Sequence, residues 1–422
     1  MQMMLFNFYR NRHPDMTEIN GTCEEESPQA DAFRMILIVG VGTAVCIIGI
    51  FLNAFLLLSL RKLPFLNSNL LYLFLLACLD ILVELCFMLI FPASLVYDYY
   101  KVERLYIMWH YYIKYVSTVG QVLIAASTLL IVAASFERYI CSIKSSMQFT
   151  SQRRFLCILG VAACALFMKG SVFFELELQT LPHCPAFQNL QLDLAEITRS
   201  EHYKTIWMFW CRSIFNVFTP FALLLLLNSL TISNLNKLHV NGFQSVLVEK
   251  RCQSIATAAA IEAATDFCLP YIADVYRPLI NKSLSCSSSF DMPTLLRRNS
   301  EACAARRRKR DATRTLAALI TIYLLTNTLN LLITIMEFIK PDTLREHGEG
   351  WTYKYLADLS SVLTISSTAF RLPVYYHCNG DIKAQIRDFS RNCFSLARAP
   401  NEKDKLKKLS LPIGSISDES VL

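Results

Sequence analysis

The sequence predicts an all-α membrane protein, a bundle of seven transmembrane helices followed by a short amphipathic helix. The 422 residues are 54% hydrophobic and only 18% charged, with a mean hydropathy of +0.36. This leaves too few polar residues to cover a soluble core of this length. Seven long apolar runs follow one another, and a bilayer core needs about 20 such residues per helix. The runs are continuous rather than alternating, which favours helices over barrel strands.

The predicted spans divide the chain into three parts. They are Met35–Leu60, Asn69–Leu95, Leu105–Phe136, Phe155–Leu176, Ile206–Ser233, Thr315–Phe338 and Tyr355–Tyr376. A tail over 1–34 precedes the bundle over 35–376, and an amphipathic helix and a second tail occupy 377–422. A long, partly disordered loop is predicted over 234–314. The first run is too long and too far from the N-terminus for a cleaved signal peptide.

Basic residues flank the spans on one side, and this bias predicts the orientation in the membrane. They include Arg61, Lys62, Lys144, Arg153, Arg154, the run 306–310, Lys383, Arg387 and Arg391. The N-terminal tail is acidic, so we expect the N-terminus outside the cell and the C-terminus inside. Asn20, in Asn-Gly-Thr, is then a glycosylation acceptor on the external tail.

Most of the fifteen cysteines lie in apolar runs or in segments predicted to be cytosolic. Reduced thiols are therefore expected rather than a disulfide scaffold. Cys23 and Cys184 lie in polar external segments, and if the external side carries a disulfide, we expect these two to form it.

Several polar residues lie at predicted membrane depth, where each is costly unless it has a role. Asn53 lies in the first span, Asp80 lies in the second, and Glu137-Arg138-Tyr139 closes the third at its cytosolic end. Pro220 interrupts the fifth span, where it is expected to kink the helix. An isolated arginine at a helix end often only reaches toward lipid headgroups, so the argument depends on the whole set.

This set resembles the rhodopsin-like family of G-protein-coupled receptors, from about Met35 to Cys393 apart from the long loop. The resemblance implies a receptor, with no enzymatic activity and a heterotrimeric G protein as partner. It also implies that Arg138 pairs with Glu137 at rest and meets the G protein on activation. Tyr375 corresponds to the tyrosine of the family's seventh-helix Asn-Pro-x-x-Tyr motif.

The chain departs from the family pattern in places that affect stability and coupling. Ile113 stands where the third helix usually carries a cysteine, so the usual clamp to the loop before the fifth helix is missing. The fourth span lacks the family's tryptophan, and the sixth lacks its Cys-Trp-x-Pro motif. The seventh reads Arg371-Leu372-Pro373-Val374-Tyr375. The chain is thus expected to be a divergent member.

One departure leads to a specific structural prediction. By the resemblance, the aspartate at Asp80 helps to hold a sodium ion, together with a serine on the third helix and asparagines on the seventh. Ser127 keeps the serine, but Arg371 replaces one asparagine. We predict that Arg371 pairs with Asp80 as a tethered cation. In the alternative, Pro373 rotates the helix and Arg371 extends toward the cytosol.

The ligand is less well defined by the sequence. Pro220-Phe221 with Asn228, and Asn327 with Asn330, are similar to invertebrate neuropeptide receptors of the FMRFamide-receptor kind, which suggests a peptide ligand. A small-molecule chemosensory receptor is the alternative. Gly120 stands where an amine receptor needs an acid, and no lysine for an opsin's Schiff base occurs between Ala357 and Tyr376. The candidate ligand-binding residues are Glu84, Lys114, Gln121, Arg212, Glu337, Trp351 and Asp358.

The segment after the seventh span predicts a helix on the membrane surface. Over Asp381–Phe394, apolar residues including Ile382, Ile386 and Cys393 fall on one face and basic residues on another. Cys393 is therefore a candidate for palmitoylation. The final residues Glu419-Ser420-Val421-Leu422 match a ligand of PDZ domains.

Two other classes of membrane protein fit the sequence less well. A transporter is expected to show inverted repeats and helices broken by glycine or proline, and only 12 glycines occur. An intramembrane enzyme needs a paired catalytic set at depth, and none is evident. We expect the plasma membrane as the location, with the lipid bilayer, an extracellular ligand and a G protein as partners, and no nucleic acid, metal or cofactor.

Overall fold

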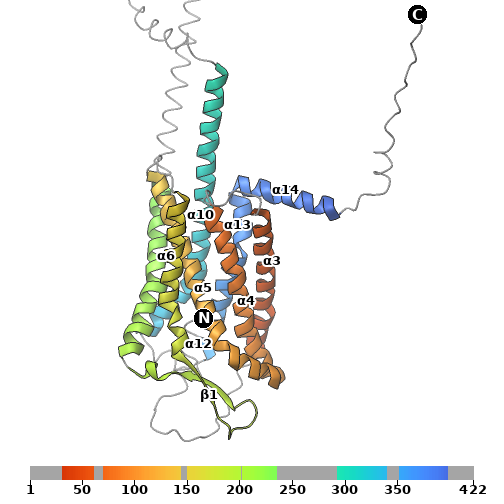
Figure 1. The fold of residues 1–422 in the computed structure, drawn as a ribbon, viewed down its shortest axis with the longest axis vertical. Coiled ribbons are helices and arrows are strands. Elements are labelled where there is room, and N and C mark those ends of the chain that lie inside the picture. The colour runs from red at the N-terminus through yellow and green to blue at the C-terminus, as the bar shows by residue number, and fades with distance from the viewer. Residues whose placement is uncertain are drawn as a thin grey trace, which may run out of the picture.

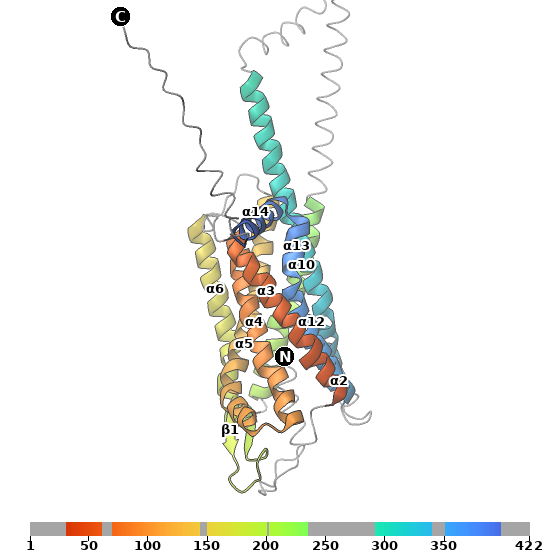
Figure 2. The ribbon, with the colours of Figure 1, turned by 90° about the vertical axis from the view of Figure 1, so that its right-hand side faces the viewer.

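The structure is a computed structural model, which describes residues 31–60, 70–143, 150–200, 202–234, 292–339 and 351–397. Long helices lie side by side in a bundle, with a β-hairpin at one end and the helix α14 across the other (Figures 1 and 2). The predicted seven-helix fold is confirmed.

The first four helices of the bundle follow the predicted spans, and each extends beyond its span at one end or both. The first is continuous over Ala32–Leu60 and comprises α2 (Ala32–Arg34), the π-helical segment η1 (Met35–Gly42) and α3 (Thr43–Leu60). The next are α4 (Leu70–Tyr100), α5 (Glu103–Ile143), and α6 (Ser151–Gly170) with the short α7 (Val172–Glu175).

The fifth helix contains two π-helical segments, η4 (Tyr203–Cys211) and η5 (Ile214–Phe218), and then continues to Asn234. The second π-helical segment ends just before Pro220, whose ring and missing N–H disturb regular α-helical hydrogen bonding. The sixth helix is α10 (Met292–Ile339), and the seventh comprises α12 (Trp351–Ala369) and α13 (Arg371–Cys378).

The sixth and seventh helices differ from what hydropathy alone indicates. Helix α10 begins at Met292 rather than Thr315, so the last part of the predicted loop over 234–314 is helical and projects beyond the bundle (Figure 1). Hydropathy detects only the lipid-embedded part of a helix, whereas this extension is rich in alanine and arginine, which are good helix formers. Six helices in the described part of the chain are apolar enough to cross a membrane. The seventh is more polar because it carries Asp358, Ser361 and Thr368. These side chains avoid lipid because they are buried within the bundle.

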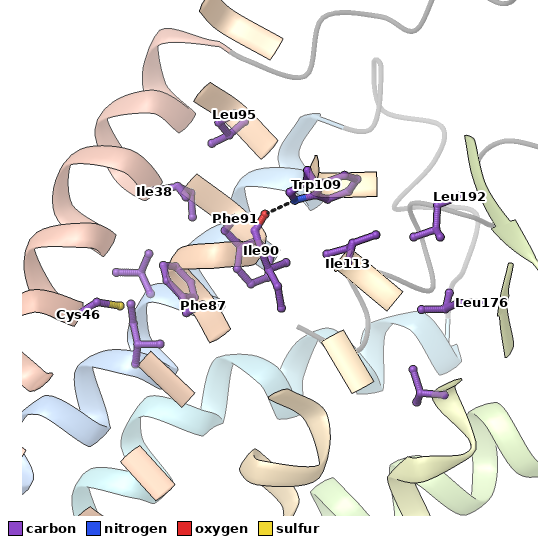
Figure 3. Packing of buried hydrophobic residues seen from close by; sticks show 13 residues of the cluster. Ile38, Cys46, Phe87, Ile90, Phe91, Leu95, Trp109, Ile113, Leu176 and Leu192 are labelled. Atoms are coloured by element: carbon purple, nitrogen blue, oxygen red, sulfur yellow. Dashed lines mark hydrogen bonds between the residues drawn. The ribbon is translucent and has the colours of Figure 1, made fainter. Parts of the chain in front are cut away.

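Apolar side chains serve two purposes in this bundle. One set forms a core between the first, second, third and seventh helices, in which Trp109 donates a hydrogen bond to the carbonyl of Ile90 at 3.0 Å (Figure 3). Another set, including Phe51, Phe155 and Phe167, is more than half exposed on the outside of the bundle. A soluble protein rarely presents such a large apolar surface, which here suits lipid.

The β-hairpin pairs β1 (Leu176–Thr180) with β2 (Leu190–Leu194) in an antiparallel register. The hydroxyl of Tyr106, on α5, donates to the carbonyl of Leu190 at 2.8 Å and accepts from its N–H at 3.1 Å. Ile113, also on α5, is fully buried in the same cluster as Leu176 and Leu192. The hairpin is thus held to the third helix by hydrogen bonds and apolar packing at the end of α5 where the family's cysteine is missing.

Helix α14 (Gly380–Ala397) is the predicted amphipathic helix. Ile382 and Ile386 are buried against the bundle, and the ring of Phe389 meets that of Phe55 edge-on, with centroids 5.4 Å apart. The side chain of Cys393 and the C-terminal residues 419–422 lie outside the described part of the chain.

Candidate functional site

Six buried polar residues meet at mid-depth in the bundle, and we call them the polar cluster: Asn53, Asp80, Glu84, Ser127, Thr368 and Arg371. Arg371 Nη1 lies 2.8 Å from Asp80 Oδ2, with side-chain exposures of 7% and 0%. Arg371 Nη2 donates to Ser127 Oγ at 3.2 Å. The structure therefore places the guanidinium against Asp80, as the sequence predicts, and the alternative orientation toward the predicted cytosolic side is not adopted.

Glu84, predicted as a ligand-binding residue, belongs instead to the polar cluster and does not line the cavity described below. Its carboxylate accepts a hydrogen bond from Thr368 Oγ1 at 2.7 Å, and Asn53 Nδ2 lies 3.5 Å from the same oxygen. The side chain is fully buried. Glu84 lies one helical turn after Asp80, on the same face of α4, which is why the two acids enter the same cluster.

Gly49 makes room for this carboxylate, which gives a direct test of the cluster's packing. A Cβ atom added at Gly49 would lie 2.2 Å from Glu84 Oε1. We expect Gly49→Ala to destabilise the protein by about 1–3 kcal/mol through overpacking, measured as a fall in the melting temperature of purified protein. Gly160→Ala is the matched control, since nothing lies within 4 Å of the added atom. It should stabilise its helix by about 0.5–1 kcal/mol, and equal melting temperatures for the two variants would contradict the expectation.

The triplet Glu137-Arg138-Tyr139 lies near the C-terminal end of α5, but its acid has a different partner from the one that the resemblance implies. Arg154, near the start of α6, donates to both oxygens of Glu137, with Nη2 2.6 Å from Oε1 and Nε 3.2 Å from Oε2. Both side chains are buried. Among the described residues, Arg138 makes no ion pair. The expected Glu137–Arg138 pair is therefore absent, because the bidentate geometry favours Arg154.

Tyr375 also lies at this end of the bundle. It is almost fully buried among apolar residues that include Leu56, Leu319 and Ile382. Tyr375, on the seventh helix, thus packs against the first and sixth helices and α14. A shift of the sixth helix would therefore change its contacts.

A cavity of about 210 Å³ occupies the bundle between the hairpin and the polar cluster, and we call it the outer cavity. At its outer end it is lined by Leu176 and Leu194, and at its inner end by Ser127, Thr368 and Arg371. Pro220 of the fifth helix also lines it. Asn327 and Asn330, singled out in the sequence, contribute to its wall from α10.

The predicted ligand-binding residues divide into three groups. Gln121 and Arg212 line the outer cavity. Lys114 does not line it but lies over the ring of Phe173, 4.5 Å from the centroid. Asp358 is not a lining residue either, because it pairs with Arg34 of the first helix at 2.6 Å. The side chains of Glu337 and Trp351 lie outside the described part of the chain.

Two buried charged residues in the wall of the outer cavity were missed by the sequence analysis. Glu175 pairs with Arg212, whose Nη1 donates to Glu175 Oε2 at 2.7 Å. Glu175 also accepts a hydrogen bond from the hydroxyl of Tyr203 at 2.7 Å. Lys169 Nζ donates to Gln121 Oε1 at 3.2 Å. Both lie near the end of the fourth span, where charged residues are ordinarily interpreted as flanks, so only their burial identifies them.

The modification sites predicted for the external side are only partly described. Cys184, in the loop of the hairpin, is disulfide-bonded. Its expected partner Cys23 and the glycosylation candidate Asn20 lie outside the described residues. Within the described ranges, no group of three or more His, Cys, Asp or Glu side chains could hold a metal ion.

Comparison with known proteins places this geometry in a known fold. No protein-family profile and no curated protein sequence matches the chain. Among solved structures, the crystal structure of squid rhodopsin is similar, with a TM-score of 0.55 and 15% sequence identity, covering 96% of this chain and 99% of the other. The bundle shares the rhodopsin fold. At this level of identity, the likeness establishes the fold alone.

Proposed function

We propose that the chain is a rhodopsin-like G-protein-coupled receptor, which carries an extracellular ligand signal to a heterotrimeric G protein. One observation carries the proposal: the outer cavity is lined at its inner end by Ser127, Thr368 and Arg371, which belong to the polar cluster. A ligand in the cavity would touch the buried ion pair directly. It could thus favour one of two arrangements of the seventh helix, as a population shift requires.

A neuropeptide is the first candidate for the ligand, on the sequence similarities at Pro220-Phe221 and at Asn327 with Asn330. The cavity volume of about 210 Å³ is below the range of roughly 300–1,000 Å³ that is usual for drug-sized ligands. It suits the end of a peptide or a small molecule, so a chemosensory receptor for small molecules is the second candidate. The absence of a lysine between Ala357 and Tyr376 argues against an opsin.

The cellular setting follows from the same proposal. We place the hairpin and the N-terminus outside the cell, and α14 and the triplet at the cytosolic face of the plasma membrane. Binding of a PDZ domain to residues 419–422 and palmitoylation of Cys393 belong to this proposal as further interactions on the cytosolic side.

The proposal predicts that signalling depends on Arg138. We expect Arg138→Ala to abolish agonist-driven nucleotide exchange on a co-expressed G protein, because it removes the cation that would meet the G protein. The agonist would come from a screen of neuropeptides and small metabolites against cells expressing the wild type. Arg153→Ala, which removes an exposed arginine at the same face, is the matched control. Normal exchange in Arg138→Ala at equal surface expression would refute the receptor function.

A further inference from the structure

We infer that the outer cavity binds its ligand through a carboxylate, which Lys169 holds in place. This inference deepens the proposed receptor function and rests on it, because the bound molecule is taken to be the ligand of that receptor. Neither the resemblance nor the fold assigns a role to Lys169. The ligand class is an apolar or aromatic body with one negatively charged end, from either a small organic acid or a peptide carboxylate.

The first argument is the balance of charge in the cavity wall. Four charged residues line the outer cavity: Lys169, Glu175, Arg212 and Arg371. Arg371 is paired with Asp80, and Glu175 is paired with Arg212. Lys169 is thus the remaining cation, and the residue is buried, with a relative exposure of 5%. A buried cation with no carboxylate of its own is costly, and a ligand anion would compensate it.

The second argument is the supply of hydrogen-bond donors. An ammonium group has three donors, and Lys169 Nζ uses one of them on the neutral amide of Gln121 at 3.2 Å. Glu175 accepts from Arg212 and Tyr203, and in the described part of the chain no hydrogen bond joins it to Lys169.

The third argument is the nature of the remaining wall. Phe87, Phe91, Phe215 and Phe221 line the same cavity, which suits an aromatic or apolar body rather than a second charge. An anchoring charge with an apolar pocket is the usual composition of a site that orients a small ligand. An uncharged amide in place of the carboxylate would not compensate Lys169.

The test compares acids with their amides on purified, full-length protein in lipid nanodiscs. The probes are 3-phenylpropionate with 3-phenylpropanamide, and N-acetylphenylalanine with its amide. We expect the acid of at least one pair to raise the melting temperature by mass action, and its amide not to do so. A shift with N-acetylphenylalanine alone identifies a peptide terminus, a shift with 3-phenylpropionate alone identifies a small acid, and either result supports the inference.

Variants connect the effect to Lys169. Lys169→Gln should weaken the acid's apparent Kd by about tenfold or more, since removing one partner of a buried charge pair has a large effect on affinity. Lys101→Gln, a lysine exposed at the same end of the bundle, should leave it unchanged. If Lys169→Gln does not fold, Gln121→Glu decides the question, because it supplies an internal carboxylate beside Lys169 and should abolish the shift.

Three outcomes would overturn the inference: equal shifts with acids and amides, no shift with any probe, or a shift that survives in Lys169→Gln or in Gln121→Glu. The melting measurement needs no G protein. Its failure therefore leaves the nucleotide-exchange test of the receptor function intact, and a failure of nucleotide exchange leaves the binding result intact.

Discussion

Replacing Asp80 with asparagine is expected to destabilise the protein by about 3–5 kcal/mol, because it leaves the guanidinium of Arg371 buried without its counter-ion. Arg371→Gln should destabilise the protein by a similar amount, because it leaves the buried acids Asp80 and Glu84 without a counter-ion. The double variant should lose less than the sum of the two, with a coupling energy of about 0.5–3 kcal/mol, since the two groups are in contact. The measurement is a double-mutant cycle on thermal unfolding of the purified protein.

An exposed ion pair serves as the control for this cycle. Glu196 and Arg199 lie 3.5 Å apart with side-chain exposures of 84% and 55%, and such pairs contribute about 0–1 kcal/mol. The Glu196→Gln and Arg199→Gln cycle should therefore show almost no coupling. Additive effects of Asp80→Asn and Arg371→Gln would mean that the buried pair is not an energetic unit.

The same pair predicts how the protein responds to sodium. Because Arg371 already supplies a cation to Asp80, exchange of sodium chloride for choline chloride at constant ionic strength should leave the melting temperature of the wild type unchanged. Arg371→Gln removes this cation but leaves Asp80, Glu84 and Ser127, so sodium should stabilise that variant. A sodium-dependent shift in the wild type as large as that in the variant would argue against a tethered cation.

The second large effect is expected near the C-terminal end of α5. Glu137→Gln leaves Arg154 without its bidentate partner, and Arg154→Gln leaves the buried acid unpaired, so each should destabilise the protein by about 3–5 kcal/mol. Since Glu137 does not pair with Arg138 in this structure, Glu137→Gln should not raise basal nucleotide exchange by releasing Arg138. Melting temperature and agonist-free exchange, normalised to surface expression, measure the two effects separately. High basal exchange in Glu137→Gln, with unchanged stability, would contradict this expectation and support the Glu137–Arg138 pair that the resemblance implies.

The sequence was sufficient for the features that depend on one helix at a time. The spans followed from apolar length, since a membrane core imposes nearly the same length on every helix. The apolar face of α14 followed from helical spacing, and Ile382 and Ile386 are buried as that spacing requires. The approach of Arg371 to Asp80 was also predictable, because neither charge has a lower-energy environment at this depth.

The choice of partners between helices was decided by the tertiary structure. Glu84 was predicted at the outer mouth, but the rotation of α4 and the space at Gly49 place it beside Thr368. Glu137 was predicted to pair with its neighbour, but Arg154 approaches it from another helix. Hydropathy and spacing describe a helix along its own axis, whereas partner choice depends on how neighbouring helices are rotated and how closely they pack. The sequence by itself thus determined that a seven-helix membrane bundle with a charged interior forms, and the packing of the helices decided which charges meet and left Lys169 facing the outer cavity.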